Sequence, residues 1–167
     1  KVLTFQSCSK TYAMTGWRIG YTAGDEIVIK AMGKLQGQST SCPSSIAQVA
    51  AIEALTGDQS EVAVMRNVFK KRRDYIVNRL NAMNGVHCDT PGGAFYVFPD
   101  FSSLMGSNKK IQSSNDLSMY LLEQKSVVTV AGKAFGSDCN VRFSYAASDE
   151  DLSRAMDLLE ETLTELE

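Results

Sequence analysis

The sequence predicts a mixed α/β protein, and three features of its pattern point to this class. Strand-like and helix-like segments follow one another along the whole chain. A long amphipathic segment from about 60 to 83 predicts a helix that connects a first part, 1–58, to a second part, 85–167. The content of 44% hydrophobic and 22% charged residues is typical of a chain with a packed core.

The first part is expected to contain two strands followed by two helices. The strands are predicted at 2–5 and 18–23. Gly24 and Asp25 supply turn and cap chemistry for a helix whose apolar residues recur at helical spacing from 28 to 35. Pro43 precedes a second helix over 44–55, which ends at Gly57. The strand at residue 2 has no earlier partner, so we expect further strands of this part upstream of Lys1.

The second part is expected to alternate strands and helices around a sheet that is covered on both faces. We expect, in order, strands at 86–88 and 94–98, a loop over 102–115, a helix at 117–124, and strands at 127–130 and 139–146. Ser148 is the predicted N-cap of the last helix, with Asp151 at the acidic position of a capping box.

Charge and composition exclude several classes of function. The formal net charge of -2 offers no basic field for nucleic acid or for an anionic membrane. No apolar run approaches the roughly 20 residues that a membrane helix needs. The four cysteines are scattered and the chain has one histidine, so we expect no metal site and no disulfide scaffold. Reduced thiols and the lack of a signal-peptide pattern predict a cytoplasmic protein, or a plastid protein if the source is a plant.

The stretch "SCSKTYAMTGWRIG", from Ser7 to Gly20, carries the most chemistry. A lysine with its usual pKa of about 10.4 is a poor nucleophile, and it becomes reactive when desolvated or placed beside another cation. Arg18 offers a planar fork for a phosphate, and Ser7 and Ser9 offer hydroxyl groups near Lys10. An amine beside phosphate donors suits pyridoxal phosphate. Spacing alone favours the alternative, a polar loop with a surface lysine.

The whole stretch "SCSKTYAMTGWRIGY" resembles the cofactor-lysine signature of class I, fold type I aminotransferases. The similarity continues through "KLQGQSTSCPSSIAQVAAIEAL", "PGGAFYVFPDFS", "AGKAFG" and "VRFSYAASDEDL", and so covers essentially the whole chain. It is strongest to aspartate aminotransferases of the bacterial and plastid type, subgroup Ib, some of which also accept prephenate. The resemblance implies three parts. Residues 1–58 form the C-terminal part of the large pyridoxal-phosphate-binding domain, and 85–167 form the small domain. Residues 59–84 form the long helix that connects the two domains.

The resemblance also implies roles for the residues of the first part. Lys10 would form the internal aldimine with pyridoxal phosphate and then move the proton between the substrate and the cofactor. Ser7 and Arg18 would hold the phosphate, and Ser9 would add a hydroxyl contact. The implied reaction is transamination between an amino acid, aspartate or glutamate, and a 2-oxo acid.

In the second part, the resemblance assigns Arg142 to the substrate α-carboxylate and Phe95 to the wall of the substrate pocket. Strand alternation puts Ser144 on the same face as Arg142, which leaves room for a ligand. The alternatives are a salt bridge for Arg142 and a core position for Phe95. The loop at Thr40 matches one that reaches the neighbouring subunit in the family, so a homodimer with composite active sites is implied.

Two departures from the family pattern bear on function. No arginine occurs between Arg18 and Arg66, so this chain does not encode the distal-carboxylate arginine of animal-type enzymes. Family members are more than twice as long, and the cofactor contacts that precede the lysine are absent here. We therefore expect weak or no catalysis from the isolated chain. Two alternatives remain open: the effector domain of a transcriptional regulator, and a truncated fragment without catalytic activity.

Overall fold

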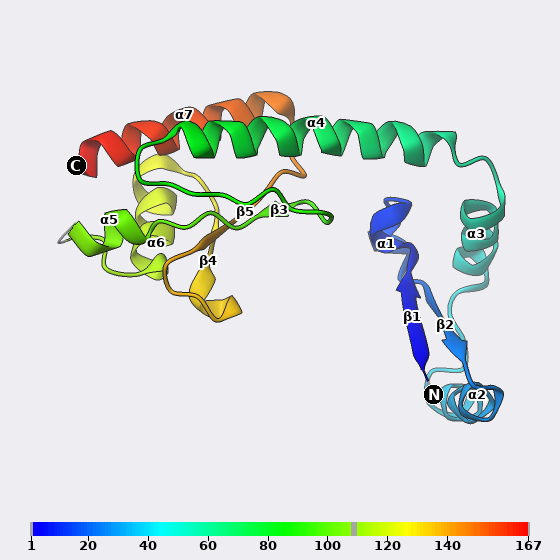
Figure 1. Cartoon of the computed structure of the whole chain (residues 1–167). Helices are drawn as coiled ribbons and strands as arrows, with labels where there is room; N and C mark the ends of the chain where they lie inside the picture. The colour runs from blue at the N-terminus through cyan, green and yellow to red at the C-terminus, as the bar shows by residue number, and fades with distance from the viewer. Residues whose placement is uncertain (1, 108–109, 167) are drawn as a thin grey trace. The chain divides into compact units, whose positions relative to one another are not determined.

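The computed structural model describes residues 2–107 and 110–166, and it divides the chain into two compact units, Lys1–Met65 and Arg66–Glu167 (Figure 1). Each unit has its own core, and each is described by itself below. Strands and helices mix in both units, as predicted for the α/β class. Within the described ranges, no helix is both long enough and apolar enough to cross a lipid bilayer.

The first unit is built on a two-stranded antiparallel sheet. Strand β1 (Leu3–Ser7) pairs with β2 (Gly20–Gly24), in a register that places Ser7 opposite Gly20. The connection between them holds the one-turn helix α1 (Cys8–Thr11) and the 3₁₀ turn η1 (Thr15–Trp17). The second strand starts two residues later than predicted, because Arg18 has a left-handed backbone with φ of 53°.

Two helices complete the first unit, and their ends follow the predicted caps. Helix α2 (Glu26–Ser39) is capped by Asp25, whose carboxylate accepts a hydrogen bond from the backbone N–H of Ile27 at 3.1 Å. Helix α3 (Ser45–Thr56) starts after Ser44 and ends at Gly57. The small core of this unit consists of Cys8, Met14, Ile19, Ala47 and Ala51.

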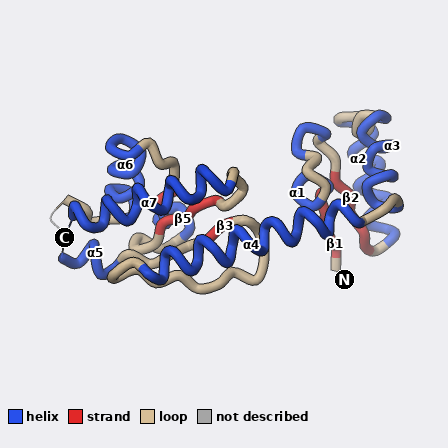
Figure 2. Tube along the Cα trace, turned by 90° about the horizontal axis from the view of Figure 1, so that it is seen from above, coloured by secondary structure: helices blue, strands red, loops and turns tan. Residues whose placement is uncertain are grey.

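Helix α4 (Ser60–Ala82) agrees with the long helix predicted from the apolar stripe. Its second half buries Ile76, Val77 and Leu80 in the core of the second unit. There α7 (Asp149–Leu166) runs alongside α4 in both views, and Arg79 on α4 donates a hydrogen bond to Asp157 on α7 at 2.8 Å (Figures 1 and 2).

The second unit contains a three-stranded antiparallel sheet in the order β3-β5-β4. Its strands are β3 (Tyr96–Val97), β4 (Val130–Ala131) and β5 (Val141–Ser144). Val97, Val141 and Phe143 are buried on the core face of this sheet. Helices α5 (Ser102–Ser107) and α6 (Ser114–Lys125) and the 3₁₀ turn η2 (Gly132–Phe135) complete the unit.

Several predicted strands of the second unit are wrong in extent. The expected strand at 86–88 is reduced to an isolated bridge between His87 and Asp100. The apolar run at 127–130 is paired only from Val130, and Val128 is 79% exposed, so this run is not covered on both faces. The predicted loop 102–115 contains α5 and the first two residues of α6, with 108–109 outside the described residues.

The predicted N-cap of the last helix is confirmed, but the Asp151 carboxylate accepts from the Ser148 hydroxyl and not, as in a full capping box, from the Ser148 backbone N–H. The Ser148 hydroxyl accepts a hydrogen bond from the Asp151 backbone N–H at 3.1 Å and donates one to the Asp151 carboxylate at 2.7 Å. This pairing satisfies a donor that the first turn of α7 would otherwise leave without a helical partner.

Candidate active site

The turn after β1 brings the two predicted serines and the lysine together. Ser7 ends β1 and caps α1, where its hydroxyl accepts a hydrogen bond from the Ser9 backbone N–H at 3.1 Å. The same hydroxyl donates to the Ser9 hydroxyl at 2.9 Å. Lys10 follows in α1 and its side chain is exposed, whereas Cys8 beside it is buried in the core. The turn therefore presents one amine and two hydroxyl groups at the end of a strand.

Arg18 lies at the same end of this hairpin, because the Cys8 backbone N–H donates to the carbonyl of its neighbour Ile19 at 3.3 Å. The guanidinium donates one hydrogen bond, to the carbonyl of Thr15 at 3.1 Å. No carboxylate of the described part of the chain forms an ion pair with Arg18. Its remaining N–H donors are thus available to an anion from outside the unit.

Gly20 lies where β2 comes very close to the backbone of β1. A Cβ at this position would lie 2.5 Å from the carbonyl oxygen of Gln6 on the neighbouring strand. Only glycine allows β2 to approach β1 this closely directly after the left-handed Arg18. The close approach fixes Gly20 as the first paired residue of β2. It therefore also fixes the position of Arg18, which lies just before this strand.

Arg18 lines a solvent-open cavity of about 770 Å³ in the first unit. Thr40, Cys42 and Ser44, from the connection between α2 and α3, line the same cavity. Ser41 in this connection has a left-handed backbone with φ of 64°. The loop at Thr40, which the family resemblance assigns to a subunit contact, therefore lies beside the predicted phosphate-binding arginine.

These groups suit pyridoxal phosphate chemically. The cofactor needs an amine for its aldehyde and cationic or hydroxyl donors for its phosphate. Lys10, Ser7 and Ser9 supply the amine and the hydroxyls within one turn, and Arg18 supplies a guanidinium that no described carboxylate neutralises. The described residues contain no group of three or more His, Cys, Asp or Glu side chains that could hold a metal ion.

Arg142 occupies the central strand of the sheet in the second unit. The register places Val130 of β4 opposite Arg142, and Tyr96 of β3 opposite Ser144, so all four residues share one face. The guanidinium carbon of Arg142 lies 4.3 Å from the ring centroid of Tyr96 and 4.7 Å from that of Phe135. Sequence reasoning missed both rings, although they lie in the quoted stretches "PGGAFYVFPDFS" and "AGKAFG".

Arg142 makes neither a hydrogen bond nor an ion pair with any residue of 2–107 and 110–166. The alternative of a strand-edge salt bridge is therefore wrong within these ranges. An arginine that rests on aromatic rings and keeps its donors open can receive a planar carboxylate along its edge.

Phe95 packs against the core, as the alternative interpretation of this residue expected. Its ring lies 4.5 Å from that of Tyr96 and 6.1 Å from that of Phe69. Its carbonyl accepts a hydrogen bond from the Tyr145 backbone N–H at 2.9 Å. These contacts hold Phe95 beside Tyr96, one of the rings on which Arg142 rests.

Tyr145 anchors the segment that precedes β3. Its hydroxyl donates to the carbonyl of Ala94 at 3.0 Å, where the backbone is left-handed with φ of 62°. Burial raises the pKa of Tyr145 above its usual value, so the phenol stays protonated and remains a donor at neutral pH. The segment carrying Phe95 and Tyr96 is thereby fixed at both the backbone and the side chains.

Comparisons with known proteins identify the family of this chain. The family model for aminotransferase class I and II matches residues 1–159. An aspartate/prephenate aminotransferase of Cereibacter sphaeroides is 49% identical over 93% of this chain and 40% of its own length. An aspartate aminotransferase of Pinus pinaster is 44% identical over 98% of this chain and 35% of its own length.

Solved structures show the same relationship. The aspartate aminotransferase of Rhizobium meliloti has a TM-score of 0.93 and 44% identity, and the match covers 99% of this chain and 42% of that one. An alanine aminotransferase of Pyrococcus furiosus has a TM-score of 0.87 at 31% identity, over 98% of this chain and 42% of that one. The chain thus spans about 40% of the length of the relatives that it matches. It belongs to the class I and II aminotransferase family.

Proposed function

We propose that this chain carries the lysine, the phosphate-binding groups and the substrate-carboxylate arginine of a pyridoxal-phosphate-dependent aminotransferase. The reaction is transamination between aspartate or glutamate and a 2-oxo acid. The observation that carries the proposal is the turn that joins Ser7, Ser9 and Lys10, next to an Arg18 without a carboxylate partner among the described residues. The names of the aspartate and aspartate/prephenate aminotransferases that the chain resembles support the substrate class.

Each residue has a stated part in this proposal. Pyridoxal phosphate supplies an electron-withdrawing ring that stabilises negative charge on the substrate α carbon. Lys10 Nζ holds the cofactor aldehyde when no substrate is present and then acts as general base and general acid for the α proton. Ser7, Ser9 and Arg18 bind the phosphate. Arg142 binds the α-carboxylate of the substrate, and Phe95 lines the pocket.

The proposal extends to the organisation of the protein. Residues 1–58 form the C-terminal part of the large cofactor-binding domain, 59–84 form the connecting helix, and 85–167 form the small domain. The protein acts as a homodimer, with the loop at Thr40 reaching the partner's site. All four cysteines are free thiols, which supports a reducing compartment such as the cytoplasm.

Covalent trapping tests the cofactor lysine directly on this chain. Pyridoxal phosphate is added, the protein is reduced with borohydride, and the labelled lysines are mapped by mass spectrometry. We expect labelling concentrated at Lys10 and lost in Lys10→Ala. Lys30→Ala is the matched control, because Lys30 is an exposed lysine of the same unit, paired with Glu26. Labelling that spreads over many lysines and is unchanged in Lys10→Ala would overturn the assignment of Lys10 in this chain.

A further inference from the structure

We propose that Tyr96 and Phe135 are positioning residues that hold the guanidinium of Arg142 so that its edge faces the ligand. Ser114 and Asp138 contribute to this positioning indirectly, because they fix the turn that carries Phe135. The identity of the ligand as a substrate carboxylate rests on the proposed function. The orientation of Arg142 rests on the contacts within the second unit alone.

An arginine side chain needs something to hold it if it is to bind a carboxylate in one geometry. Freezing such a long, flexible side chain costs rotamer entropy. Arg142 has no hydrogen bond or ion pair in the described ranges, so polar partners there do not provide this restraint. The two rings, at 4.3 Å and 4.7 Å from the guanidinium carbon, are the contacts that can.

The two rings that contact Arg142 belong to different elements of the second unit. Tyr96 belongs to β3 and Phe135 follows β4, and these two strands flank β5. Tyr96 is fixed by strand pairing with Ser144 and by the ring of Phe95. The N–H donors of a guanidinium lie in its plane, so two ring contacts that fix the orientation of this plane also fix the direction from which a carboxylate can accept two of them.

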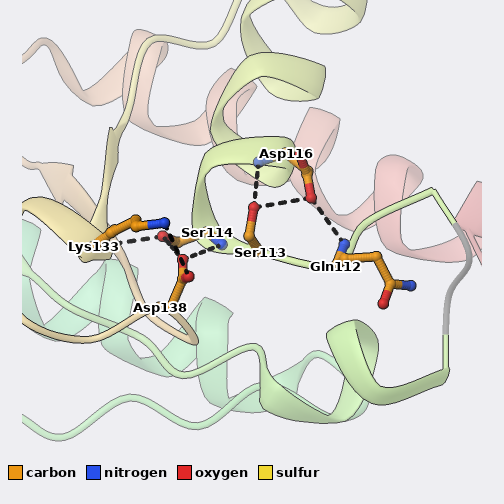
Figure 3. A network of polar contacts seen from close by, with 6 residues as sticks. All are labelled: Gln112, Ser113, Ser114, Asp116, Lys133 and Asp138. Atoms are coloured by element: carbon orange, nitrogen blue, oxygen red, sulfur yellow. Dashed lines mark hydrogen bonds and ion pairs between the residues drawn. The ribbon is translucent and has the colours of Figure 1, made fainter.

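Phe135 depends on a turn that is built around a buried hydroxyl (Figure 3). Ser114 is fully buried, and its hydroxyl donates to an Asp138 carboxylate oxygen at 2.9 Å. The backbone N–H of Ser114 donates to the carbonyl of Asp138 at 2.9 Å, and the Lys133 backbone N–H donates to the Ser114 hydroxyl at 3.2 Å. The first turn of α6 therefore holds both ends of the segment from Lys133 to Asp138.

Two further contacts define the path of this turn. A Cβ on Gly132 would lie 2.2 Å from the carbonyl oxygen of Asn140, so the backbone at the start of the turn lies very close to the backbone at Asn140. The ring of Phe98 meets that of Phe135 edge-on, with centroids 6.0 Å apart and planes at 90°. The position of the Phe135 ring over Arg142 thus follows from packing and hydrogen bonds that do not involve Arg142.

Nuclear magnetic resonance of the full chain tests the proposal without cofactor or turnover. The Hε–Nε signal of Arg142 is assigned by its loss in Arg142→Lys. A guanidinium stacked on aromatic faces is shielded, so we expect this signal upfield of exposed arginines. Phe135→Leu and Tyr96→Leu should each move it downfield. Tyr75→Leu is the matched control: Tyr75 lies 5.9 Å from the Arg79 guanidinium, so only the Arg79 signal should move.

The Asp138 variants separate positioning from folding. Asp138→Asn keeps a carbonyl oxygen for the Ser114 hydroxyl, so the Arg142 signal should stay close to its original position. Asp138→Ala removes that acceptor and should move the signal toward the value in Phe135→Leu. Unchanged methyl signals of buried Val141 show in each variant that the sheet is intact.

Acetate is the probe for the carboxylate site, with chloride at the same ionic strength as control. We expect acetate alone to shift the Arg142 signal, and the slope of this titration to fall about twofold to tenfold in Phe135→Leu. A signal that neither leucine variant moves would overturn the contact. An acetate response that is unchanged after the shielding is lost would overturn the positioning role. Either result is separate from the trapping experiment, which tests Lys10 and the proposed function.

Discussion

At the scale of single residues, the groups of the candidate site are held in two different ways, by a local turn and by strand register. Ser7, Ser9 and Lys10 are neighbours in the chain, and one turn keeps them together. The two rings that contact Arg142 belong to Tyr96 and Phe135, which lie on other elements of the second unit. Their contact follows from pairing between three strands, which no local pattern specifies.

Arg18 should determine whether the phosphate group of the cofactor contributes to binding. In the trapping experiment, pyridoxal phosphate should label Lys10 more efficiently than pyridoxal, which lacks the phosphate. Arg18→Gln removes the charged donor, and a hydrogen bond to a charged group contributes about 1.5–3 kcal/mol, so this preference should fall about tenfold or more. Arg66→Gln serves as the control. A preference that persists in Arg18→Gln would contradict the assigned role.

Gly20 and Gly33 should respond to alanine with opposite signs. At Gly20 the added Cβ lies 2.5 Å from a backbone oxygen, which must move, so Gly20→Ala should cost about 1–3 kcal/mol. Gly33 lies inside α2 with nothing within 4 Å, so Gly33→Ala should add about 0.5–1 kcal/mol. Urea unfolding followed by the fluorescence of Trp17, the single tryptophan, measures both in the first unit. Equal effects would show that the close approach at Gly20 is relaxed.

At the scale of elements, helix ends were predictable because a cap is a local hydrogen bond. Asp25, Ser148 and Gly57 all lie where the sequence placed them. The strands of the second unit were predicted too long, because hydrophobic alternation does not say how far a partner extends. The run at 127–130 shows this, since its pairing begins only at Val130, where β5 provides a partner.

The cap of α6 should make the second unit sensitive to acid. Hydrogen bonds from the Ser113 hydroxyl, first, and from the Gln112 backbone N–H lower the pKa of Asp116 below its usual value. A depressed pKa stabilises the folded state above the unfolded value of about 3.9, and this contribution is lost as the pH falls through the folded pKa. Asp116→Asn should therefore be less stable than the natural sequence at pH 7, with the difference shrinking below about pH 4.

Urea unfolding by circular dichroism at several pH values measures this dependence. Glu123→Gln, on an exposed position of the same helix, is the control and should show no such trend. Ser113→Ala removes the N-cap hydroxyl and should cost about 1 kcal/mol at pH 7. A stability difference for Asp116→Asn that is constant from pH 7 to pH 3 would contradict the cap.

At the scale of the whole molecule, composition and motif order could be used to predict the α/β class and the family. The chain spans about 40% of the length of the relatives that it matches. Within the chain, Lys10 and Arg18 belong to one unit and Arg142 to the other. The amine and the carboxylate-binding group of the proposed reaction therefore have separate cores to support them.

A chimera tests whether these separate groups work together. The part of the Rhizobium meliloti aspartate aminotransferase that precedes the match is joined to this chain, which is 44% identical to that structure and covers 42% of it. We expect the chimera to transfer the amino group of aspartate to 2-oxoglutarate. Lys10→Ala should lower the rate by at least about a hundredfold, because it removes the general acid and base. Arg142→Gln should raise the KM for aspartate far more than it lowers labelling at Lys10. A folded chimera that labels at Lys10 and yet transfers no amino group from aspartate would contradict the proposed substrate class, whereas a folded chimera without labelling at Lys10 would contradict the proposed cofactor site.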